Sequence, residues 1–304
     1  MNNLVKVIFS IIFFLSVNFN SNAEENNINE LTEDDINSIY EFATMASMGV
    51  IFHEIGHLIV DEFNVPIFNN EEDVADSFMA WSLIHIPDEY ESYDDYEYWS
   101  KEPHKVIKGI SDYYYYKILL GEDSHEIFGQ KNAEYSDHAT DNKRFFNIAC
   151  FMKGANPEVF DSYITQRGLE YILEDKCDYN YWQMSDAWWK IFQGNGSGYS
   201  ADDYEFWETE VSNYIQKIKL EFQNSDEIVY QYFEEYSKDT ILYFLQNHVA
   251  QIKLRENYTL SFEMCEGEIN AYYISSQNKI LICYELVEEF MRVKDEILLL
   301  KELL

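Results

Sequence analysis

The segment that most constrains this chain is His53-Glu54-Ile55-Gly56-His57, which lies inside a mostly apolar stretch from about Tyr40 to Asp61. The stretch has helical spacing, and residues four apart on a helix share one face. Both imidazoles can therefore reach one metal ion, while Glu54 can contact a metal-bound water. The segment predicts a zinc site with Glu54 as general base. The alternative is a helix whose core histidines are satisfied by hydrogen bonds.

A catalytic zinc needs a third protein ligand and an open position. No third histidine follows at short spacing, but Glu72-Asp73-Val74-Ala75-Asp76 lies on a predicted helix from about Glu71 to Ile86. The run resembles the ExxAD element of glutamate-ligated zinc peptidases, in which the aspartate orients a ligating histidine. We therefore expect Glu72 to join the two histidines as a zinc ligand, with Asp76 behind them. The alternative is an ordinary acidic first turn of a helix.

Acyl transfer also needs a hydrogen-bond donor for the oxyanion. Asp137 and His138 lie just before a predicted helix at 140–153. His138, oriented by Asp137, is the candidate catalytic donor, and Tyr135 is a weaker one. The spacing leaves a solvated loop histidine equally open.

The first 23 residues have the pattern of an export signal. Lys6 precedes a short apolar run, 7–17, and the small-residue pattern at 21–23 predicts cleavage after Ala23. A membrane anchor is the alternative, although the run is short for a bilayer span. We expect a periplasmic or secreted protein with no stable membrane anchor.

The chain has a formal net charge of −35, and 47% of its 304 residues are hydrophobic. A large core is therefore expected, whereas nucleic acid and anionic membranes would be repelled. The expected partner is a peptide or protein substrate. The sequence predicts no oligomeric state.

Four cysteines in an exported chain predict disulfide bonds. They are Cys150, Cys177, Cys265 and Cys283. Three connectivities are open, and the simplest joins sequence neighbours, Cys150 with Cys177 and Cys265 with Cys283. Free buried thiols are the alternative.

The fold class expected is mainly α with a small antiparallel β element (α+β), built around a zincin-like HExxH helix. Residues 194–200 contain a Gly/Ser-rich linker that separates a predicted metallopeptidase-like domain, 24–193, from a C-terminal region, 201–304. Capping residues and spacing predict further elements. Helices are expected from Thr32 and near 104–120, 140–153, 157–166, 177–192, 201–220, 226–249 and from about 285, with strands at 258–264, 271–275 and 279–284.

Three stretches of the chain resemble a bacterial family described as "putative metallopeptidase", a domain of unknown function. They begin with FHEIGHLIVDEFNVPIF, SDHATDNKRFFNIACF and LEDKCDYNYWQMSDAWW, and together span about residues 45–192. The resemblance implies a metal-binding role for His53, His57 and Glu72 and a base role for Glu54. It also implies that Cys150 and Cys177 belong to one unit.

The segment 264–290 resembles the same family, but in the usual order it precedes the HExxH helix. The region is therefore either a permuted part of the domain or a truncated second copy. Permutation would bring this β element against the zinc helix, with the strand 279–284 as an edge for an extended peptide.

These features predict an exported zinc metallopeptidase that hydrolyses peptide bonds through a zinc-activated water. Two alternatives stay open. One is an inactive, zinc-bearing binding protein of the envelope, and the other is a zinc amidase that acts on cell-wall crosslinks.

Overall fold

The computed structural model describes residues 31–67, 70–85, 101–122, 140–169, 176–194, 217–249, 252 and 254–303. Several predicted features lie outside these residues: the export signal, the Asp137-His138 pair with Tyr135, and most of the Gly/Ser linker. They stay predictions.

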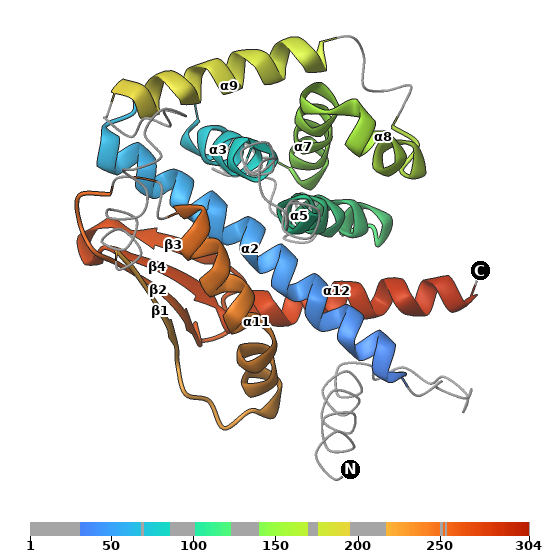
Figure 1. The fold of residues 1–304 in the computed structure, drawn as a ribbon. Helices are drawn as coiled ribbons and strands as arrows, with labels where there is room; N and C mark the ends of the chain where they lie inside the picture. The colour runs from blue at the N-terminus through green and yellow to red at the C-terminus, as the bar shows by residue number, and fades with distance from the viewer. Residues whose placement is uncertain are drawn as a thin grey trace, which may run out of the picture.

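The described chain is mainly helical with one small sheet, which confirms the expected fold class (Figure 1). The helices are α2 (Glu33–Phe63), α3 (Glu71–His85), α5 (Lys101–Leu119), α7 (Asp141–Ala155), α8 (Pro157–Gln166), α9 (Cys177–Gly194), α11 (Ile228–Asn247) and α12 (Tyr284–Leu303). The strands are β1 (Ile218–Phe222), β2 (Tyr258–Glu263), β3 (Ala271–Ile274) and β4 (Lys279–Cys283), and a 3-10 turn, η4 (Ser275–Gln277), joins the last two. The predicted elements in these regions therefore form, with one exception.

The exception is the predicted helix 201–220, because its last residues belong to strand β1. Ile218, Leu220 and Phe222 alternate with exposed Lys219 and Glu221, a period of two that predicts a strand. The helical prediction was wrong there because the alternation covers only five residues and is easily missed beside a longer helical pattern.

The sheet is mixed, with strand order β1-β2-β4-β3, rather than purely antiparallel. β1 pairs with β2 in parallel because α11 carries the chain back between them. β2 also pairs with β4 in parallel, while β3 and β4 form the expected antiparallel hairpin. β4 therefore lies inside the sheet, so the prediction that 279–284 is an edge strand was wrong. The edge next to it is β3.

Helix α2 is the centre of the molecule. It is one continuous helix of 31 residues that begins with a capping box between Thr32 and Asp35 and ends at Asn64 in the left-handed conformation. Its length and composition would suit a membrane span, but 89% of its most apolar window is buried inside the protein. Burial on all sides explains why the sequence around the HExxH segment has so few polar residues.

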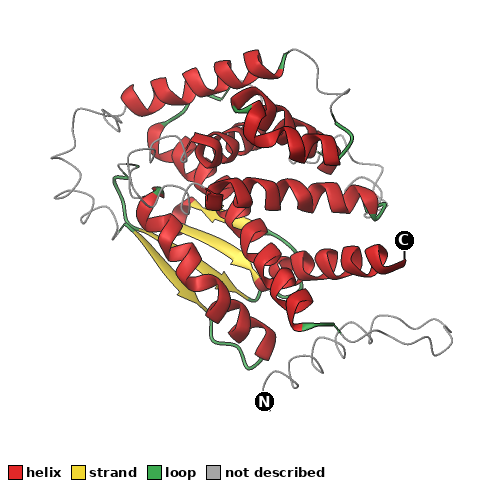
Figure 2. Ribbon diagram, turned by 45° about the vertical axis from the view of Figure 1, so that its right-hand side comes forward, coloured by secondary structure: helices red, strands yellow, loops and turns green. Residues whose placement is uncertain are grey.

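Two groups of elements cover α2. Helices α3 and α5 pack on one side, and α11, α12, β3 and β4 also contact it (Figure 1). Figure 2 shows the four strands together at one side of the helical part. One continuous hydrophobic core includes residues from both sides. The C-terminal region thus helps to hold the helix that carries the histidines.

Both disulfides join the pairs of sequence neighbours, as the simplest connectivity predicts. Cys150 of α7 is bonded to Cys177, the first residue of α9, and Cys265 is bonded to Cys283 at the end of β4. The loop after β2 is further held by Glu285, whose carboxylate accepts hydrogen bonds from the backbone of Cys265. Two such bonds are typical of proteins from oxidising compartments.

A buried carboxylate on α12 gives a stability prediction. Burial, together with the charges of Glu296 and Asp35, raises the pKa of Asp295 to about 6, and its Oδ1 has no hydrogen-bond partner in the described part of the chain. Because the folded pKa exceeds the unfolded one, ionisation above about pH 4 opposes folding, and the cost is complete above about pH 6. Asp295→Asn should raise the free energy of unfolding by about 1–2 kcal/mol at pH 8, after allowance for solvent screening.

The same substitution should change the free energy of unfolding little at pH 3.5, where the carboxyl group is mostly protonated in both states. Urea unfolding at the two pH values measures the difference. An equal effect at both would show that the charge of Asp295 is not responsible.

Candidate metal centre

The two histidines lie on the same face of α2, one turn apart, with ring centroids separated by 4.9 Å. His53 and Glu54 are only 3% and 5% exposed, whereas His57 is half-buried. The apolar flanks of the segment bury this part of the helix, so the polar face must find its partners within the protein.

Helix α3 supplies those partners because it packs very closely on α2. A Cβ atom on Gly56 would lie 2.7 Å from Cα and 3.0 Å from the backbone oxygen of Ala75. Only glycine therefore permits this approach. Ala75 stands between Glu72 and Asp76 on α3, so the contact brings both carboxylates to the histidines. Asn70 fixes the start of α3 by accepting a hydrogen bond from the backbone N–H of Glu72.

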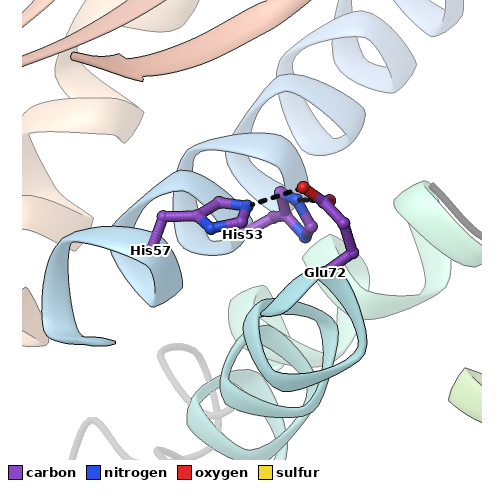
Figure 3. Close-up of side chains that lie close together, drawn as sticks. All are labelled: His53, His57 and Glu72. Carbon is purple, nitrogen blue, oxygen red and sulfur yellow. Dashed lines mark hydrogen bonds and ion pairs between the residues drawn. The ribbon is translucent and has the colours of Figure 1, made fainter. Parts of the chain in front are cut away.

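The carboxylate of Glu72 faces both imidazoles, and dashed lines join it to each of them in Figure 3. Its Oε2 is 3.1 Å from Nε2 of His53, and its Oε1 is 3.3 Å from Nε2 of His57. One donor atom from each of the three residues lies within 4.8 Å of the other two. The structure thus brings the three predicted ligands together.

These donor atoms fit a zinc ion. Nitrogen and oxygen ligands lie about 2.0–2.2 Å from zinc, and tetrahedral geometry then places neighbouring ligand atoms about 3.3–3.5 Å apart. The two nitrogen–oxygen separations in the site are close to this value. Two neutral imidazoles and one carboxylate are also a donor set that zinc enzymes use.

Each histidine has a second carboxylate at its other ring nitrogen. Nδ1 of His53 is 2.7 Å from Oδ1 of Asp76, and Nδ1 of His57 is 2.8 Å from Oε1 of Glu71. Carboxylates in this position hold the proton on Nδ1, which leaves the lone pair of Nε2 free to bind a metal. Asp76 therefore lies where the sequence placed it. The contact of Glu71 with His57 was not predicted, although Glu71 directly precedes Glu72 in the sequence.

Helix α7 also reaches the site. Arg144 donates through Nε to Oδ2 of Asp76 at 2.9 Å, and its neighbour Lys143 forms a more exposed ion pair with Asp73. Sequence reasoning assigned no role to Arg144. Its distance from Asp76 in the chain hides the contact, which depends on how α7 packs.

The charges of the site favour protonated histidines when no metal is bound. Burial lowers the pKa of His57, but hydrogen bonds and charge from Glu72 and Glu71 outweigh it and raise the pKa to about 9. Burial also opposes protonation of His53, and Asp76 and Glu72 reverse that effect, so its pKa is raised too. A metal ion must displace these protons, so its affinity should fall as the pH falls.

Asp76 itself stays ionised. Burial raises the pKa of its carboxyl group, but the positive charge of Arg144 and the interaction with His53 outweigh burial and hold the pKa well below its usual range. An ionised Asp76 can accept a hydrogen bond from His53 at neutral pH.

A family described as "Putative metallopeptidase" matches residues 10–192, which is more than half of the chain. The chain belongs to this family. The match confirms the resemblance seen in the sequence, and the family description implies a metal-dependent hydrolase. Comparison with curated proteins gives no match, and neither does comparison with solved structures.

The family match contains α2, α3 and α7, and therefore every residue of the centre described above. It ends before the sheet, α11 and α12. The origin of the C-terminal region, whether permuted or a second copy, stays a prediction.

Proposed function

We propose that this protein is an exported, zinc-dependent peptidase. The observation that carries the proposal is the convergence of His53, His57 and Glu72, with Glu54 buried beside the histidines on the same helix. A bound zinc ion would act as a Lewis acid that lowers the pKa of water and polarises a carbonyl group. His53, His57 and Glu72 would hold it.

The protein's own groups then have separate tasks. Glu54 follows the first histidine directly and so is directed differently on the helix from the two ligands. We propose that it accepts a proton from the attacking water and passes it to the leaving amine. Asp76 and Glu71 hold the imidazoles in the orientation in which Nε2 is a donor to the metal.

The edge strand β3 is the proposed place for an extended substrate. The backbone N–H of Cys283 in β4 donates to the oxygen of Asn270, so the main-chain groups of alternate residues, 271 and 273, turn to the outer edge. No described strand pairs with that edge. A peptide could extend the sheet there through main-chain hydrogen bonds.

This edge runs close to the catalytic half of α2. The hydroxyl group of Tyr273 donates to Asp61, two turns beyond Glu54, at 2.9 Å. Tyr272 of the same strand lies near enough to Glu54 to respond to its charge. The pKa of Tyr272 is raised by a hydrogen bond to Glu268, by burial and by the charges of Glu268 and Glu54. Because the hydrogen bonds of a strand bind several residues of a peptide at once, we expect oligopeptides to be better substrates than dipeptides.

Export is supported by two independent features. Residues 1–23 have the pattern of a cleaved signal, and two disulfides lie within the described chain. Disulfides persist in the periplasm and outside the cell.

The test is cleavage of a peptide library by the purified mature protein. We expect cleavage that stops when a chelator removes the metal and returns when zinc is added. Cell-wall fragments in parallel separate a peptidase from a zinc amidase. Zinc binding without cleavage of either substrate class would favour the inactive binding protein.

A further inference from the structure

Arg144 joins the metal centre to a helix that carries none of the proposed ligands. Its Nε and a terminal nitrogen donate to the two oxygens of Asp76. Oδ1 of Asp76, which accepts the hydrogen bond from that terminal nitrogen, also lies 2.7 Å from Nδ1 of His53. The guanidinium lies over the ring of Tyr114, 4.8 Å from its centroid. One carboxylate thus connects the arginine of α7 to the histidine of α2.

The geometry restricts how Asp76 can turn. Two parallel N–H groups on a planar guanidinium fix the plane of a carboxylate, which one ammonium group cannot do. The aromatic ring of Tyr114 and the low exposure of the pair (13% for Arg144 and 11% for Asp76) restrict the guanidinium itself. The carboxylate is therefore held in one orientation, with one oxygen directed at His53. The same terminal nitrogen of Arg144 also lies 3.2 Å from Nδ1 of His53, so the guanidinium contacts both partners.

We propose that Arg144 is a positioning residue for the metal centre, acting on zinc affinity through Asp76 and His53. The inference rests on the proposed function, because it assumes that His53 binds the metal. Loss of partners at this distance from a metal typically weakens binding about 10–100-fold.

A simpler role would be an ion pair that only fastens α7 to α3. Lys143, the preceding residue, offers a matched comparison because it joins the same two helices through Asp73. That pair is more exposed, and Asp73 is not among the proposed ligands or their partners. A purely structural role predicts that Arg144 and Lys143 variants change stability and leave metal affinity alone.

The experiment measures the zinc dissociation constant by competition with a chromophoric chelator for wild type, Arg144→Gln, Arg144→Lys and Lys143→Gln. Urea unfolding of the metal-free proteins is measured alongside. We expect about 10–100-fold weaker binding for Arg144→Gln, a smaller loss for Arg144→Lys, and a change within about twofold for Lys143→Gln. Cobalt-substituted protein should show an altered visible spectrum only in the Arg144 variants.

A folded Arg144→Gln protein with the zinc affinity of the wild type would overturn the inference while leaving the proposed function intact. If Arg144→Gln does not fold, Arg144→Lys decides, because it keeps the charge and loses the two-point contact. Unchanged affinity there would overturn the inference as well. A folded wild type that binds no zinc would overturn the proposed function and the inference together.

Discussion

Glu54→Gln should lower the rate of peptide hydrolysis by about 10²–10⁴-fold, the usual contribution of a general base. The amide has nearly the same shape as the carboxylate but cannot accept the proton of the attacking water. Because Glu54 is not one of the proposed ligands, the zinc content of the variant should equal that of the wild type. Single-turnover cleavage of a peptide found in the library, with metal analysis of the same sample, measures both.

Glu41→Gln is the matched control, since Glu41 lies on the same helix but is exposed and pairs with Lys105. It should leave the hydrolysis rate unchanged. If Glu54→Gln kept wild-type activity with zinc bound, another group would be the base.

The second large effect is expected from Gly56→Ala. The new methyl group would meet the backbone of Ala75, which cannot move away as a flexible side chain can. Helix α3 must then shift, and Glu72 and Asp76 move with it. Overpacking of this kind costs about 1–3 kcal/mol, partly offset by the roughly 1 kcal/mol helix preference of alanine over glycine. We expect zinc affinity to fall at least about tenfold, because the ligands no longer converge.

Gly49→Ala separates this effect from general destabilisation. A Cβ there would lie 2.5 Å from Cβ of Ile110, so it would push on α5, a helix that carries none of the proposed ligands. It should lower the free energy of unfolding and leave zinc affinity within about twofold. Equal losses of affinity in both variants would mean that Gly56 has no special relation to the metal centre.

The sequence predicted the local part of the centre well. His53 and His57 are placed by helical periodicity on α2, and Glu72 and Asp76 by the same periodicity on α3. Each depends only on spacing within one helix. The start of α2 at Thr32 was predictable for a similar reason, because local capping chemistry determines it. The disulfide pairing was only the simplest of three connectivities that the sequence left open.

The features that the sequence did not predict depend on packing between distant segments. The direction of β4 relative to β2 follows from the path of the chain across the sheet, which periodicity does not contain. The contact of Arg144 with Asp76 depends on the placement of α7 against α3. The close approach at Gly56 was visible only as a glycine within the HExxH segment, and its partner Ala75 could not be inferred from spacing.

The central claim is that His53, His57 and Glu72 form a zinc site, and metal analysis of the purified mature protein tests it most directly. We expect about one zinc ion per chain in the wild type, retained in Glu54→Gln and largely lost in Glu72→Ala. A folded wild-type protein that takes up no zinc from a metal-containing buffer would contradict it. Zinc retained fully in Glu72→Ala would contradict the assignment of the third ligand.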